Sequence, residues 1–229
     1  FFRDLLGPEV FNDEPFEPLT IRVQDRTVSA QVGAFFPGQM MIRLADTPRP
    51  AARSGDICMH EFTHAVVHRI ARLDDEFASP IARGINEGFA DYAQATFFND
   101  PRFGDWVRDE PKGARRCDDK TLRLKADPQD PQDRYKVGAA WAALLWDFRG
   151  LVGPGVADAI AFHSLQFLMP RCTYETARQA LHHADLALPE FTALAVQFGT
   201  ELKARFHQLI LRSRILPALS APPFLPSAA

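Results

Sequence analysis

Residues 60–64 read His-Glu-Phe-Thr-His (HEFTH), with two histidines four positions apart and a glutamate directly after the first. In an α-helix, positions i and i+4 lie on one face, with Cβ atoms about 5–6 Å apart. His60 and His64 can therefore direct imidazole nitrogens at one metal ion, and such ligands suit zinc. Glu61 is rotated by about 100° around the helix, so we expect it to act as a general base on a water molecule rather than as a ligand.

A catalytic zinc ion needs a third protein ligand, and the stretch NEGFADY, residues 86–92, offers one on a second predicted helix. Glu87 follows His64 by 23 residues, which is enough for one helix to end and another to begin. Asp91 is one turn after Glu87 on the same face, where its carboxylate could accept the free N–H of zinc-bound His60. The alternative is a chance HExxH string in an ordinary helix, which arises in on the order of 1% of chains this long.

The elements around these two helices predict the fold class. Segments before the motif are rich in β-branched and apolar residues, and those after it have helical texture. The expected strands cover residues 19–25, 27–36 and 39–45. The expected helices cover residues 56–73, 86–98, 135–148, 155–169, 174–185 and 190–212. Helices packed on one face of a small sheet give an α+β fold.

The organisation is that of a single domain with two lobes. The sheet and the HExxH helix form an N-terminal lobe over residues 1–75, a helical lobe covers 76–216, and 217–229 form a Pro-rich tail. Residues 1–18 are expected to be an irregular arm, and 99–133 a long excursion with little regular structure. Asp56 is the expected N-cap of the HExxH helix.

Composition limits the partners of the chain. The 229 residues are 46% hydrophobic, which is ample for a buried core. A net charge of −3 gives no reason to expect a nucleic acid, and no apolar run approaches the roughly 20 residues of a membrane span. Three cysteines leave open one Cys117–Cys172 bridge or three free thiols, with Cys58 expected in the core. A basic cluster is interpreted as a solvated loop; its members are Lys112, Arg115, Arg116, Lys120, Arg123 and Lys125.

These motifs resemble those of the gluzincin metallopeptidases, specifically the thermolysin and fungalysin branch. HEFTHAV, residues 60–66, is similar to their HExTHxx helix, and NEGFADY is similar to their glutamate helix. The resemblance implies a thermolysin-like catalytic domain with zinc in a cleft between the two lobes, acting on a peptide or protein substrate. It also suggests a secreted or cell-envelope location, and it leaves open a propeptide or neighbouring domains.

The resemblance extends to the stretch before the motif helix, VGAFFPGQMMIR, residues 32–43. In the family, an Asn-Ala-Phe-Trp strand there lies at the edge of the sheet and pairs with the substrate backbone. Gly33, Ala34 and Phe35 are then the implied substrate-binding residues. Gly33 replaces the family's Asn, so one side-chain hydrogen bond would be missing, whereas pairing through backbone groups would remain.

The helix YKVGAAWAALLWDF, residues 135–148, resembles the family helix that follows an oxyanion-stabilising histidine. Counting back from Gly138 places Tyr135 at that histidine's position, and its hydroxyl can serve as a neutral donor. Arg134 is the neighbouring candidate if the register slips by one residue.

The sequence therefore predicts a zinc peptidase, and specifically an endopeptidase, in which Glu61 is the general base and Tyr135 assists at the oxyanion. Two alternatives stay open. An aminopeptidase would need an acidic anchor for the substrate amine, and no GxMEN-like string is present. A non-catalytic module of gluzincin fold would use zinc or the cleft for binding alone. The intact Glu61 argues against that module, and the missing histidine argues for it.

Overall fold

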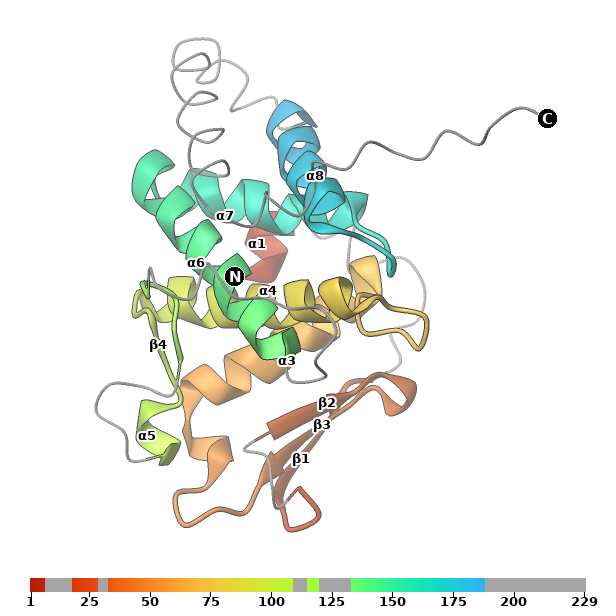
Figure 1. The fold of residues 1–229 in the computed structure, drawn as a ribbon. Helices are drawn as coiled ribbons and strands as arrows, with labels where there is room; N and C mark the ends of the chain where they lie inside the picture. Colours follow the sequence, from red (N-terminus) through yellow and green to blue (C-terminus); the bar gives the residue numbers. More distant parts are fainter. Residues whose placement is uncertain (7–17, 29–32, 109–114, 120–132, 188–229) are drawn as a thin grey trace, which may run out of the picture.

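The structure is a computed structural model, and it describes residues 1–6, 18–28, 33–108, 115–119 and 133–187. Within these residues it is mostly helical with a small sheet, which confirms the predicted α+β class (Figure 1). The helices are α1 Phe2–Leu6, α3 Gly55–Ala71, α4 Pro80–Phe98, α5 Asp105–Arg108, α6 Asp133–Val152, α7 Pro154–His163 and α8 Tyr174–Ala187. The strands are β1 Thr20–Asp25, β2 Gly33–Phe36, β3 Met41–Ala45, β4 Arg102–Phe103 and β5 Arg115–Arg116. No described helix is both long enough and apolar enough to span a membrane.

The N-terminal sheet has the strand order β1-β3-β2. Strand β3 runs parallel to β1 and antiparallel to β2, with Gly33 opposite Leu44 and Phe36 opposite Met41. Strand β2 is thus an edge strand among the described residues, with one side paired to β3 and the other open. Helix α3 packs next to this sheet, and α4 lies between α3 and α6 (Figure 1). This order places the open edge of β2 beside the HExxH helix.

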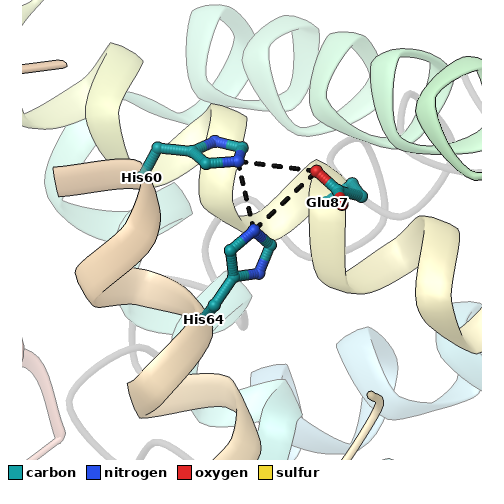
Figure 2. Close-up of side chains that lie close together, drawn as sticks. All are labelled: His60, His64 and Glu87. Atoms are coloured by element: carbon teal, nitrogen blue, oxygen red, sulfur yellow. Dashed lines mark hydrogen bonds and ion pairs between the residues drawn. The ribbon is translucent and has the colours of Figure 1, made fainter. Parts of the chain in front are cut away.

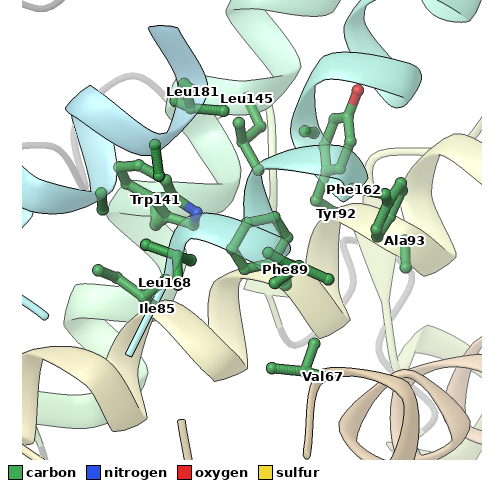
Figure 3. Packing of buried hydrophobic residues seen from close by; sticks show 14 of the residues in the cluster. Val67, Ile85, Phe89, Tyr92, Ala93, Trp141, Leu145, Phe162, Leu168 and Leu181 are labelled. Carbon is green, nitrogen blue, oxygen red and sulfur yellow. The ribbon is translucent and has the colours of Figure 1, made fainter. Parts of the chain in front are cut away.

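The larger of two cores surrounds α4, whose side chains from Gly84 to Thr96 are all buried. Phe89 and Tyr92 of α4 meet Trp141 of α6 and Phe162 of α7 in this core (Figure 3). A smaller core under the sheet includes Ile42, Leu44, Ala51, Ile57 and Phe103. Helix α4 is therefore held on several sides, which fixes its buried side chains from Gly84 to Thr96.

Helices α4 and α6 approach each other closely at glycines, which leave no side chain between the two backbones. A Cβ added at Gly138 would lie 2.6 Å from the Cβ of Glu87 and 3.0 Å from the backbone nitrogen of Gly88. A Cβ at Gly88 would lie 2.7 Å from the carbonyl oxygen of Gly138. This close approach packs the start of α6 directly behind Glu87.

Several boundaries differ from the sequence expectations. Helix α4 begins at Pro80, earlier than expected, because the Ser79 hydroxyl accepts from the Ala82 N–H and proline suits the first helical turn. The expected N-cap Asp56 is instead inside α3, and Ser54 is the N-cap residue. Asp56 Oδ2 accepts from the Gly104 backbone N–H at 2.6 Å, so it joins α3 to the segment after β4.

The first residues are also not an irregular arm throughout, because α1 buries Phe2 and Leu6 in the larger core. The expected helix over 155–169 is α7 followed by a 3-10 turn, Ser164–Phe167. All three cysteines are free thiols, and Cys117 and Cys172 are buried. Residues 29–32, the expected helix over 190–212 and the tail over 217–229 lie outside the described residues.

Candidate metal site

Three potential ligand atoms converge beside the sheet. His60 and His64 project from α3 and Glu87 from α4, and all three are buried (Figure 2). The distance from His60 Nε2 to His64 Nε2 is 3.1 Å, and Glu87 Oε2 lies 3.5 Å from the first and 3.8 Å from the second. Among the described residues, this is the one group of three or more His, Cys, Asp or Glu side chains that could hold a metal ion.

The spacing of these atoms fits a tetrahedral ion. With ligand distances of about 2.0–2.2 Å, neighbouring ligand atoms of a tetrahedral zinc site lie about 3.3–3.6 Å apart. The three distances between the ligand atoms, from 3.1 to 3.8 Å, bracket that range. Glu87 Oε2 is also buried without a hydrogen-bond partner. An ion between the three atoms would satisfy this oxygen, so the residues present fit a metal ion.

The other ring nitrogen of each histidine faces a side-chain oxygen from α4. His60 Nδ1 lies 3.0 Å from Asp91 Oδ1, and His64 Nδ1 lies 3.0 Å from Asn86 Oδ1. Both atoms of the His60–Asp91 contact are buried. With the proton on Nδ1, each Nε2 presents its lone pair to the ion. Sequence reasoning gave Asn86 no role, although it is a polar residue next to Glu87 in a largely apolar helix.

The charged groups of the site shift one another's pKa values. Burial opposes the charged form of His60, but the carboxylates of Asp91 and Glu87 outweigh it and raise its pKa to about 9. Burial also opposes ionisation of Glu87, yet contact with His60 and the nearby positive groups holds its pKa well below the usual range. The carboxylates of Asp91 and Glu87 thus favour positive charge on His60.

Glu61 is not one of the three potential ligands, but it lies in the same cavity. It is 6% exposed, and it lines the same cavity as His60, His64 and Glu87. Burial raises the pKa of its carboxyl group above the usual range. A carboxylate with raised proton affinity is a stronger base.

Arg115 is a further functional candidate, and here the solvated-loop interpretation is wrong. Its guanidinium lies 3.0 Å from Asp91 Oδ1 and 3.7 Å from Glu87 Oε2, over the ring of Phe103. It is largely buried, because β5 pairs with β4 and carries it toward α4. The sequence did not predict this role, because Arg115 lies among other basic and polar residues and no local spacing relates it to the metal ligands. Arg116, the next residue, pairs instead with Asp118 at 2.7 Å.

Tyr135 and Arg134 both line the cavity from the first turn of α6. Arg134 donates to the Tyr135 hydroxyl oxygen at 2.7 Å, and its Nε lies 3.9 Å from Glu87 Oε1. The Tyr135 hydroxyl therefore accepts from a cation and keeps its own proton for another acceptor. The two candidates that the sequence left open thus form one hydrogen-bonded pair.

The cavity encloses about 800 Å³ between β2 and the helices. Gly33, Ala34 and Phe35 line it along the open edge of β2, opposite Arg134 and Tyr135. A volume of this size is typical of sites that take a small molecule or a short peptide segment. Every site residue named from the sequence lines this cavity except Asp91, which lies behind His60.

No protein-family model matches the chain, and the comparison with curated proteins finds no match. The functional argument therefore rests on the residues and their geometry.

Proposed function

We propose that the chain is a zinc-dependent peptidase, and specifically an endopeptidase with a thermolysin-like arrangement of its catalytic domain. The observation that carries the proposal is the triangle of His60, His64 and Glu87 ligand atoms with the Glu61 carboxylate next to it. A structural zinc site has no use for that carboxylate, whereas hydrolysis needs a base.

The substrate would lie extended along the open edge of β2. Its backbone groups would pair with those of Gly33, Ala34 and Phe35, as an added strand does. This places the scissile bond between the sheet and the ligand group, because both line one cavity. Ile57 and Phe103 line the same cavity and give it apolar surface for a substrate side chain.

A zinc ion bound by the three ligands would polarise the scissile carbonyl and acidify a water molecule. Glu61 would remove a proton from the attacking water and pass it to the leaving amine. Asp91 and Asn86 would hold the two imidazole rings in place through Nδ1. The Tyr135 hydroxyl would donate a hydrogen bond to the developing oxyanion, strengthened by the hydrogen bond it accepts from Arg134.

The decisive experiment combines metal analysis with the Glu61→Gln variant. We expect about one zinc per chain after dialysis against metal-free buffer, and cleavage of a peptide library by the zinc-loaded protein. Glu61→Gln should keep the zinc and lose roughly 10²–10⁴-fold in turnover, the usual contribution of a general base. The exposed Glu76→Gln is the matched control and should match the wild type. Zinc binding without any cleavage would favour a non-catalytic module, and equal turnover in Glu61→Gln would exclude its role as base.

The oxyanion assignment has its own test. Tyr135→Phe removes the hydroxyl but keeps the ring, so kcat should fall by roughly 10²–10³, as on loss of an oxyanion donor. Arg134→Gln removes the charge but can still donate to the hydroxyl, so its effect on kcat should be smaller. Zinc content should be unchanged in both. A larger loss in Arg134→Gln than in Tyr135→Phe would transfer the role to Arg134.

A further inference from the structure

Strand β2 approaches Glu61 most closely at its first residue, Gly33. A Cβ added at Gly33 would lie 2.7 Å from Glu61 Oε1, 2.8 Å from its Cγ and 3.0 Å from its Cδ. Ordinary contacts of a Cβ begin near 3.4 Å. The side chain of Glu61 thus occupies the space that any larger residue at position 33 would need.

The backbone at Gly33 does not itself require glycine. Gly104 and Gly153 have positive φ, and Gly33 is not among the described glycines that do. It pairs with Leu44 in regular antiparallel register. Gly38, a few residues further on, has nothing within 4 Å of an added Cβ. What distinguishes Gly33 is the nearness of the Glu61 side chain.

Glu61 lines the same cavity as the ligand side chains of His60, His64 and Glu87. It also directly follows His60 in α3. The Glu61 side chain therefore lies close against the backbone of β2, within the cavity that also holds the ligand group. A displacement of Glu61 by a side chain at position 33 would change the distance from its carboxylate to the water molecule that it would deprotonate.

We propose that Gly33 is a positioning residue: its missing side chain leaves the space in which β2 holds the Glu61 carboxylate beside the ligand group. This deepens the proposed peptidase function and rests on it. It also assigns Gly33 a role distinct from substrate binding. With an alanine in its place, the carboxylate would have to retreat by about 0.7 Å to restore a 3.4 Å contact. The affected atoms all belong to the Glu61 side chain and none to the backbone, so the fold should persist.

The test compares Gly33→Ala with Gly38→Ala, the same chemical change where space is free. We expect Gly33→Ala to keep its zinc and its KM and to lose roughly 10–100-fold in kcat, in line with the cost of misplacing a reacting group by up to 1 Å. A rise in KM at constant kcat would instead mark a substrate-binding residue and overturn the proposal. Gly38→Ala should be indistinguishable from the wild type.

A second variant separates the contact from any strain in the strand. Glu61→Ala removes Cγ, Cδ and Oε1, the three atoms that an added Cβ at Gly33 would meet, so adding Gly33→Ala in that background should leave the midpoint of chemical denaturation unchanged. If Gly33→Ala fails to fold alone but folds together with Glu61→Ala, the conflict between the two side chains is supported. If both fail to fold, the strand itself needs glycine and the proposal is wrong.

Crystal structures of the metal-free variants provide a readout that is independent of activity. The Glu61 carboxylate should move in Gly33→Ala and stay in place in Gly38→Ala. An unmoved carboxylate, with β2 displaced instead, would overturn the positioning role. If the wild type cleaves no peptide, the peptidase proposal fails, and these structures still decide whether Gly33 places Glu61.

Discussion

The two sides of the cavity carry groups of opposite charge that nearly touch, with 3.7 Å between Arg115 Nη1 and Glu87 Oε2. The two sides differ in the secondary-structure elements that carry these groups. The ligands lie in the middle of α3 and α4, and α4 is buried over most of its length. Arg115 lies in a two-residue strand, and Tyr135 lies in the first turn of α6.

This difference shows how the site is assembled. The ligand side is fixed by helix geometry and by the large core behind it. The Arg115 side depends on contacts between distant segments, such as the hydrogen bond from the Gly104 N–H to Asp56 and that from Arg49 to the Trp106 carbonyl. We therefore expect core changes to alter global stability, ligand-side changes to alter metal affinity, and changes at Arg115 to have the smallest effect on either.

The largest effect should come from Trp141→Ala, which breaks the core behind α4. Trp141 is fully buried and packs over Gly88, the residue after Glu87. Truncating a buried tryptophan typically costs about 3–5 kcal/mol in the free energy of unfolding. Chemical denaturation of the metal-free protein measures this. Trp106→Ala, on a partly exposed tryptophan, should cost about 0.5 kcal/mol or less. A similar cost in both variants would show that α4 does not depend on this core.

Asp91→Asn should act on metal affinity. The carboxylate lies 3.0 Å from His60 Nδ1 and helps to fix the ring, so we expect zinc to bind about 10–100-fold more weakly, measured by competition with a chelator. Asp74→Asn is the matched control, because Asp74 contacts His68 Nδ1 at 2.6 Å but His68 is outside the ligand group. Unchanged affinity in Asp91→Asn would mean that this carboxylate does not support the ligand.

The same division explains what the sequence could predict. His60, His64 and Glu87 follow from helical spacing and from the reach of a second helix, which are local properties. The position of Arg115 could not be predicted in this way. Its approach to Asp91 depends on the pairing of β4 with β5 and on the hydrogen bond from the Gly104 N–H to Asp56. The α+β class was predictable from texture, whereas the expected start at residue 86 was late because Ser79 and Pro80 were given no role at the start of α4. The burial of α1 needed a tertiary contact that no periodicity reveals.

Arg115→Gln should have the smallest effect and sharpens the comparison most. The guanidinium places a positive charge 3.7 Å from Glu87 Oε2 and 3.0 Å from Asp91 Oδ1, so it repels a cation bound by Glu87. Its removal should therefore strengthen zinc binding, by up to about tenfold after partial screening. Arg116→Gln, one residue away and paired with Asp118, should leave zinc affinity unchanged. Chelator competition on both variants measures the change. Weaker zinc binding in Arg115→Gln would mean that Arg115 holds Asp91 and Glu87 in place, so that the ligand side also depends on the contacts of β5.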